Sequence, residues 1–179
     1  MYVSGQKNAI TVEITSVWFA GATNVYSREF YQLAQSRLRR GGVLQQWLQL
    51  HHISPREVES IVATIRSVFP YVSCWRAGEQ VMIVASMEPQ IASADRRALL
   101  ESRMEPLIPG NAEQQAKIAH EILESRLTST QGVDRMVSSI PAVINTDHNR
   151  WLEYATPKYN ASGVAWEPRN VAFLSSFDR

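Results

Sequence analysis

The chain has 179 residues, with 18 lysines and arginines against 17 aspartates and glutamates, and its formal net charge at pH 7 is +1. This balance gives no long-range field toward nucleic acid or an anionic membrane, so we expect neither as a partner. The hydrophobic share of 45% is enough to form a core. No apolar run reaches the roughly 18 residues of a membrane span. A single cysteine, together with the lack of a secretory leader pattern, favours a reducing cytoplasm.

The first predicted element is a strand over residues 9–14, whose sequence AITVEI is mostly β-branched and apolar. This composition suits a strand buried on both faces of a parallel sheet. In open α/β sheets, ligands bind beyond the carboxyl ends of the strands, so Glu13, Thr15, Ser16 and Trp18 are expected to project toward a crevice there. The alternative is that Glu13 caps a neighbouring helix or pairs with an arginine, and the spacing alone does not decide between them.

A helix is predicted next, with Ser27 as its N-cap and an apolar stripe continuing to about Arg39. The run RRGG over residues 39–42 is expected to end this helix, because glycine supplies a left-handed turn. A second strand is predicted over residues 43–50. Its Gln46 either reaches the crevice and contacts a substrate or is a buried amide with its own hydrogen-bond partners.

Residues 51–86 continue the α/β pattern. His51 and His52 are adjacent, and in an extended segment their side chains point to opposite faces, which argues against a shared metal ion. The sequence SPRE over residues 54–57 predicts a helix start with a capping box and a proline in the first turn. Two strands, at residues 71–75 and 79–86, are separated by three residues and therefore form an antiparallel hairpin.

Beyond residue 88 the composition becomes helical and polar, which suggests a division into an α/β domain over residues 1–88 and a helical extension with a tail over residues 89–179. Helices are predicted from Ser93 to about Met104 and from Asn111 to about Leu127, with a shorter one over residues 132–139. The amphipathic tail is expected to pack back on the core. Near residue 150, Asp147 and Glu153 could bind a cationic group, or they could make a turn and a surface ion pair.

Two stretches resemble one family. Residues 13–17, EITSV, followed by residues 26–31, YSREFY, are similar to the fourth strand and following loop of the spermidine synthase (polyamine aminopropyltransferase) family, where the pattern is Asp-Ser-Thr-Asp-Pro and then a Glu-Phe-Tyr helix start. Residues 144–157 resemble the Asn-Thr-Asp-Asp-x-Pro-x-Leu-Glu-Tyr segment of spermidine-synthase-like proteins. By this resemblance Glu13 stands where the catalytic aspartate stands. Ser16 stands where a second aspartate binds the amine substrate in the family, although a serine side chain carries no negative charge.

The resemblance implies a partial Rossmann-like methyltransferase fold, comprising the C-terminal half of the sheet with its closing antiparallel hairpin and a helical C-terminal extension. It implies transfer of an aminopropyl group from decarboxylated S-adenosylmethionine to a polyamine such as putrescine, with Glu13 as the catalytic base. From their positions at the strand ends, Thr15, Ser16, Trp18 and Gln46 are then the expected substrate-binding residues. Methyl transfer from S-adenosylmethionine and a non-catalytic module are the open alternatives.

The cofactor-binding part of this family precedes the stretch that begins here, and no G-x-G-x-x-G pattern occurs in the 179 residues. We therefore expect that the chain is a C-terminal portion which alone binds no cofactor and no metal and is inactive. The strand over residues 9–14 would lack its usual neighbour. An unpaired apolar edge predicts a homodimer or association with a missing N-terminal half.

Overall fold

The computed structural model describes residues 5–13, 17–89, 94–159 and 163–178. It contains a five-stranded mixed sheet with the strand order β1-β2-β4-β3-β5. The strands are β1 (Lys7–Val12), β2 (Leu38–Gln49), β3 (Tyr71–Ala77), β4 (Gln80–Ser86) and β5 (Arg126–Thr128). The helices are α1 (Arg28–Arg37), α2 (Pro55–Arg66), α3 (Ala94–Met104), α4 (Ala112–Glu124), α5 (Thr130–Ser139), α6 (Trp151–Ala155) and α7 (Trp166–Ser175), with 3₁₀ turns η1 (Ala22–Tyr26), η2 (Thr156–Tyr159) and η3 (Ser176–Asp178).

The sheet has the mixed topology that the sequence predicts. β1 and β2 run parallel, β2 pairs antiparallel with β4, and β4 pairs antiparallel with β3 from Tyr71 opposite Ser86 to Ala77 opposite Gln80. The predicted hairpin is therefore confirmed, and the α/β arrangement is consistent with a partial Rossmann-like fold that continues into helices at its C-terminal end.

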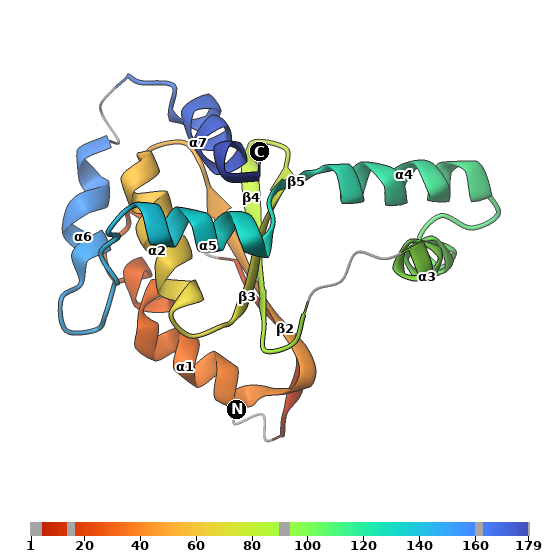
Figure 1. Ribbon diagram of the computed structural model, residues 1–179, viewed down its shortest axis with the longest axis horizontal. Coiled ribbons are helices and arrows are strands. Elements are labelled where there is room, and N and C mark those ends of the chain that lie inside the picture. Colours follow the sequence, from red (N-terminus) through yellow and green to blue (C-terminus); the bar gives the residue numbers. More distant parts are fainter. Residues whose placement is uncertain (1–4, 14–16, 90–93, 160–162, 179) are drawn as a thin grey trace.

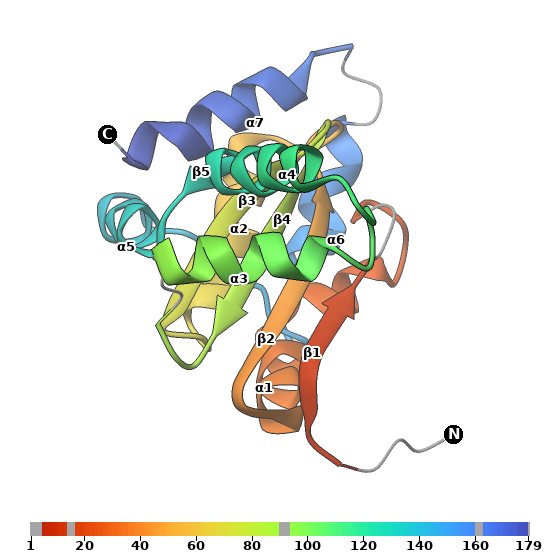
Figure 2. The same cartoon turned by 90° about the vertical axis from the view of Figure 1, so that its right-hand side faces the viewer.

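The helices lie on both sides of the sheet (Figure 1). α1, α2, α5 and α6 lie on one side, and α7 packs against α2 and β5. The core lies there, and its central helix α2 is buried at every residue from Glu57 to Ile65. α3 and α4 pack on each other and stand on the opposite side of the sheet (Figure 2). We call this helix pair the arm. None of the helices in the described part of the chain is long and apolar enough to cross a membrane.

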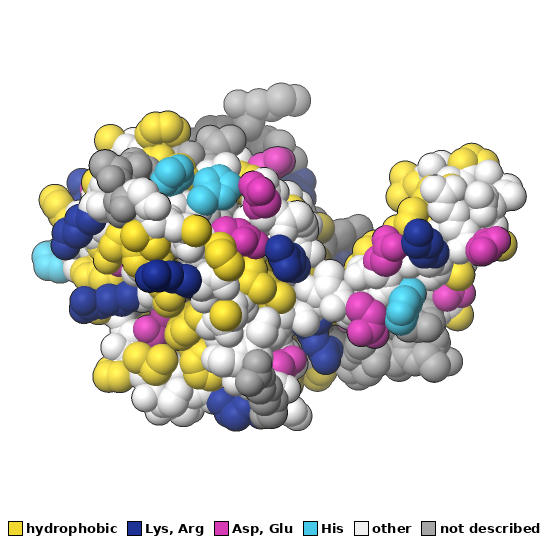
Figure 3. Space-filling model, turned by 90° about the horizontal axis from the view of Figure 1, so that it is seen from above, with side chains coloured by type: hydrophobic (Ala, Val, Ile, Leu, Met, Phe, Trp, Pro, Cys, Tyr) yellow, Lys and Arg dark blue, Asp and Glu magenta, His cyan; other side chains and the backbone are white. Residues whose placement is uncertain are grey.

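A hollow of about 1190 Å³ lies between the arm and the open face of the sheet. Val43, Trp75 and Met82 line it from the strands, while Leu100 and Ile122 line it from the arm. Seen from above, the arm stands off the main body of the molecule (Figure 3). Because the tail does pack on the core through buried Leu174, the segment after residue 88 contributes to both sides of the sheet. The proposed division at residue 88 stays a prediction.

The first strand differs from its prediction in position and burial. It runs over Lys7–Val12, and Ile14 lies outside the described residues. Of its residues only Val12 is buried, whereas Ala9 and Thr11 are exposed, so burial on both faces was wrong. The physical reason is its place at the edge of the sheet, with β2 on one side and no other described strand beside it. The apolar composition alone indicated a central strand, whereas the outer position agrees with the expectation that this strand lacks its usual neighbour.

The double glycine also lies in a different element. α1 ends at Arg37 and β2 begins at once with Leu38, so residues 39–42 form an irregularity in the strand rather than the end of the helix. Gly41 has a φ of 70°, the left-handed conformation that the sequence indicated. A Cβ at Gly42 would lie 2.9 Å from the carbonyl oxygen of Lys7, so the absence of a side chain lets β2 approach β1. Gly41 and Gly42 therefore form part of a bulge in β2.

The helix predicted to run to about Leu127 is shorter. α4 ends at Glu124, and Arg126–Thr128 forms β5, which pairs with β3 at Cys74 and Trp75. Pairing of these residues with the edge of β3 therefore outweighs their helical propensity.

Candidate functional site

The carboxyl ends of β1 and β2 lie at the same edge of the sheet because the two strands are parallel. Glu13 follows β1 directly and is exposed. Within the described part of the chain it makes no hydrogen bond or ion pair that would mark it as a helix cap or an arginine partner. The structure therefore presents a solvent-accessible carboxylate at the strand ends, where ligands bind in open α/β sheets. Thr15 and Ser16, predicted beside it, lie outside the described residues.

Three rings gather where β2 ends. The ring of Trp18, a half-buried residue, meets the His52 ring edge-on with 5.1 Å between centroids, and the His51 and His52 rings are 5.6 Å apart. His52 has a φ of 66°, a conformation that few residues other than glycine adopt and that often marks a functional position. The expectation of an extended segment with opposed histidines was wrong, since the two residues form a turn. Trp18 lies beside His52, close to the end of β2, and its projection toward a ligand crevice stays a prediction.

Gln46 belongs to the core. Its side chain is fully buried, accepts a hydrogen bond from the Tyr31 hydroxyl at 3.3 Å and donates one to the carbonyl oxygen of Trp47 at 3.1 Å. Burial raises the pKa of the Tyr31 hydroxyl well above its usual value, which keeps this phenol a neutral donor. Of the two alternatives left open by the sequence, the buried amide with its own partners describes this residue.

The loop after β1 is held by a carboxylate from far along the chain. Glu153, on α6, accepts hydrogen bonds from the amide of Gly21 at 3.1 Å and from the hydroxyl of Thr23. Gly21 has a φ of 81° and precedes η1, so Glu153 fixes the turn that leads into that helix. Since its oxygens are engaged in this way, Glu153 acts as a support for the loop rather than as a free cation-binding group.

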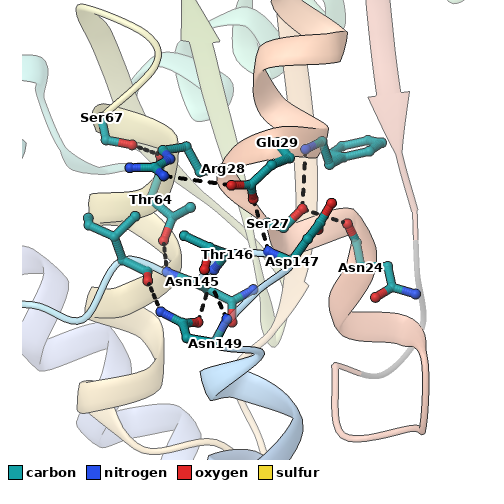
Figure 4. Close-up of polar contacts among 12 residues, drawn as sticks. Asn24, Ser27, Arg28, Glu29, Thr64, Ser67, Asn145, Thr146, Asp147 and Asn149 are labelled. Atoms are coloured by element: carbon teal, nitrogen blue, oxygen red, sulfur yellow. Dashed lines mark hydrogen bonds and ion pairs between the residues drawn. The ribbon is translucent and has the colours of Figure 1, made fainter.

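Asn145 joins the same loop to the rest of the core (Figure 4). Its side chain donates to the carbonyl oxygen of Tyr26 at 3.1 Å and accepts from the amide of Leu152 at 3.1 Å. Its backbone amide donates to the Thr64 hydroxyl on α2, and its carbonyl oxygen accepts from the amide of Arg28. Sequence reasoning missed this residue, because nothing in the local pattern distinguishes a buried asparagine from a turn asparagine.

Asp147 meets the start of α1 through its backbone. Its amide donates to the carboxylate of Glu29 at 2.9 Å, and this hydrogen bond lowers the pKa of Glu29, with the neighbouring Arg28 adding to the effect. The Asp147 side chain is exposed. This hydrogen bond joins the start of α1 to the segment around residue 147 (Figure 4).

No protein family model matches the chain. A 57-residue part of it is 42% identical to polyamine aminopropyltransferase 2 of Pseudomonas aeruginosa, a match that spans 31% of this chain and 16% of that enzyme. The local match supports a spermidine-synthase-like relationship. Hydrogen bonds of Asn145 and Glu153 join the two stretches that carry the resemblance in sequence, residues 13–31 and 144–157.

In the described part of the chain, the starts of α1 and α2 are occupied by their own capping side chains. The helices that follow the two parallel strands begin with side chains bound to their own amides: Ser27 accepts from the amide of Phe30, and Glu57 completes a capping box with Ser54. Neither connection is glycine-rich in the manner of a nucleotide-binding turn. Among the described residues, the strand ends carry the Glu13 carboxylate and the rings of Trp18, His51 and His52.

Proposed function

We propose that this chain is a spermidine-synthase-like module that presents the amine-binding side of an aminopropyl-transfer site. Its ligand would be a diamine of the putrescine type, and Glu13 would be the proton acceptor. The observation that carries the proposal is the exposed carboxylate directly after the carboxyl end of β1, in a stretch that shares the family's helix start.

The chemistry of an amine acceptor suits these groups. An aliphatic amine is protonated at neutral pH and must lose a proton before its nitrogen can attack, and a carboxylate within hydrogen-bond reach can take that proton. The second ammonium group and the methylene chain need an anionic or aromatic surface. Trp18 and the adjoining histidine rings provide aromatic surface at the same edge.

Decarboxylated S-adenosylmethionine would supply the aminopropyl group. In this proposal it is bound by a half that comes from outside the 179 residues, as a fused segment or as a separate chain. A second candidate, a non-catalytic amine-binding module, is favoured by the structural use of Glu153.

The test is a putrescine titration followed by amide and side-chain NMR shifts. We expect shifts concentrated at Glu13, Trp18 and His52, and an affinity loss of about twofold to fivefold in Glu13→Gln, the range of an exposed ion pair. Glu113→Gln removes an exposed carboxylate on α4 and serves as the matched control. Unchanged affinity in Glu13→Gln, or shifts confined to other surfaces, would contradict the proposal.

Decarboxylated S-adenosylmethionine is the companion ligand in the same samples. We expect no binding in the low micromolar range, which corresponds to about −8 kcal/mol. Tight binding to the isolated chain would show that the nucleoside site lies within it. If a cofactor-binding half restores turnover, an unchanged rate in Glu13→Gln would favour the non-catalytic role of this residue, whereas loss of a general base lowers rates by about 10²- to 10⁴-fold.

A further inference from the structure

The free edge of β1 has features of a self-complementary surface. Among the described residues no strand covers it, and the strand contains no proline, which are the conditions under which an edge pairs with another chain. Its two charges stand at opposite ends. Lys7 opens the strand, Glu13 follows it, and the residues between them are neutral.

We propose that β1 pairs antiparallel with β1 of a second copy, with Ile10 opposite Ile10 on the twofold axis. In this register Lys7 of each copy lies opposite Glu13 of the other, which gives two equivalent ion pairs. Ala9 then lies opposite Thr11. The interface is isologous, as expected for a closed homodimer.

The burial pattern of β1 favours registers in which core-facing residues of the two strands lie opposite each other. Val12 is buried and Ile10 packs against the core cluster, whereas Ala9 and Thr11 are exposed, so even-numbered residues face the core. A register displaced by one residue would place a core-facing side chain opposite a solvent-facing one and put the two helical layers on opposite faces of the joined sheet. With Ile10 on the twofold axis, the core-facing side chains of the two β1 strands lie on the same face of the joined sheet. Registers displaced by two residues keep the faces but separate Lys7 from Glu13.

The ion pairs have a consequence that rests on the proposed function. Glu13 cannot hold a diamine and the partner's Lys7 at the same time, so dimer formation would close the amine site and a diamine would weaken the dimer. The dimer itself depends only on the edge and its charges.

Sedimentation velocity over a range of concentrations measures the dimer constant. We expect Lys7→Glu and Glu13→Lys each to weaken dimerisation at least about fivefold, and the double variant to restore it, because the ion pairs re-form with reversed polarity. Lys117→Glu, an exposed charge reversal on the arm, is the matched control and should leave the constant unchanged. A monomeric parent at all concentrations, or a double variant weaker than both single ones, would overturn the proposal.

Cysteine cross-linking reads the register directly. Directly opposed residues have Cβ atoms about 4.5–5.5 Å apart, close to disulfide geometry. Under mild oxidation Ile10→Cys should give a covalent dimer, whereas Ala9→Cys and Thr11→Cys should not, because neither faces its own copy in this register. Preferential cross-linking by either of those two would overturn it. If cross-linking succeeds but putrescine leaves the dimer constant unchanged, the dimer stands and the amine site at Glu13 fails.

Discussion

Replacing Asn145 with alanine should be among the most damaging substitutions outside the apolar core. The asparagine is 1% exposed, and its side chain satisfies the Tyr26 carbonyl and the Leu152 amide, both in buried surroundings. Each buried polar group left without a partner costs about 1–3 kcal/mol, so the expected loss is about 2–6 kcal/mol. Since whole domains are stable by about 5–15 kcal/mol, this is a large fraction of the total.

Urea unfolding followed by circular dichroism and tryptophan fluorescence measures the loss. With a denaturant slope of about 2 kcal/mol/M, a loss of about 4 kcal/mol lowers the midpoint by about 2 M. Asn149→Ala is the control: it removes the hydrogen bonds of an exposed side chain to the Ile144 carbonyl oxygen and to the amides of Thr146 and Trp151, and it should cost about 1 kcal/mol. If Asn145→Ala is no more destabilised than Asn149→Ala, the reasoning on buried partners is refuted.

Two further predictions concern α1 and the bulge. The hydrogen bond from the Asp147 amide lowers the pKa of Glu29, so the stabilisation that this bond gives is present above the unfolded-state pKa and is lost as pH falls through the folded-state pKa. Glu29→Gln should therefore remove part of the acid destabilisation seen in urea midpoints between about pH 7 and pH 3. Parallel pH profiles for the parent and the variant would contradict this. Gly42→Ala should lower stability by about 1–3 kcal/mol, because its Cβ would meet the backbone oxygens of Lys7 and Arg39 at 2.9 Å, and a melting temperature equal to that of the parent would show that the bulge can adjust.

Local signals in the sequence predicted those features whose causes are local. Ser27 caps α1, Asn111 caps α4 by accepting from the amide of Gln114, and the hairpin of β3 and β4 forms as its short connection requires. Each depends on residues within a few positions of one another. Glu13 was predicted inside the strand over residues 9–14, near its carboxyl end, and the structure places it one residue beyond β1, which ends at Val12.

The remaining features depend on partners far along the chain. A left-handed glycine fits a helix end and a strand bulge equally well, so only the pairing of β2 with β1 decides the role of Gly41. The segment around Arg126 becomes a strand because β3 offers an edge. Gln46 and Asn145 are amides whose burial is set by elements that the local pattern does not include. At the site, His52 was set aside because its turn could not be distinguished from an extended segment.

The bond between Asn145 and Tyr26 joins positions 119 residues apart, and it sets an order of events during synthesis. Ribosomes add about 5–20 residues per second. At least several seconds therefore pass between the emergence of the loop after β1 and that of Asn145, whose side chain donates a hydrogen bond to the Tyr26 carbonyl oxygen of that loop. During that interval the loop and the edge strand before it lack their final support, and neighbouring chains on one polysome would expose the same unfinished edge. We therefore expect the nascent chain to need chaperone protection until the segment around residue 145 has left the ribosome, and premature termination before residue 145 to yield aggregates.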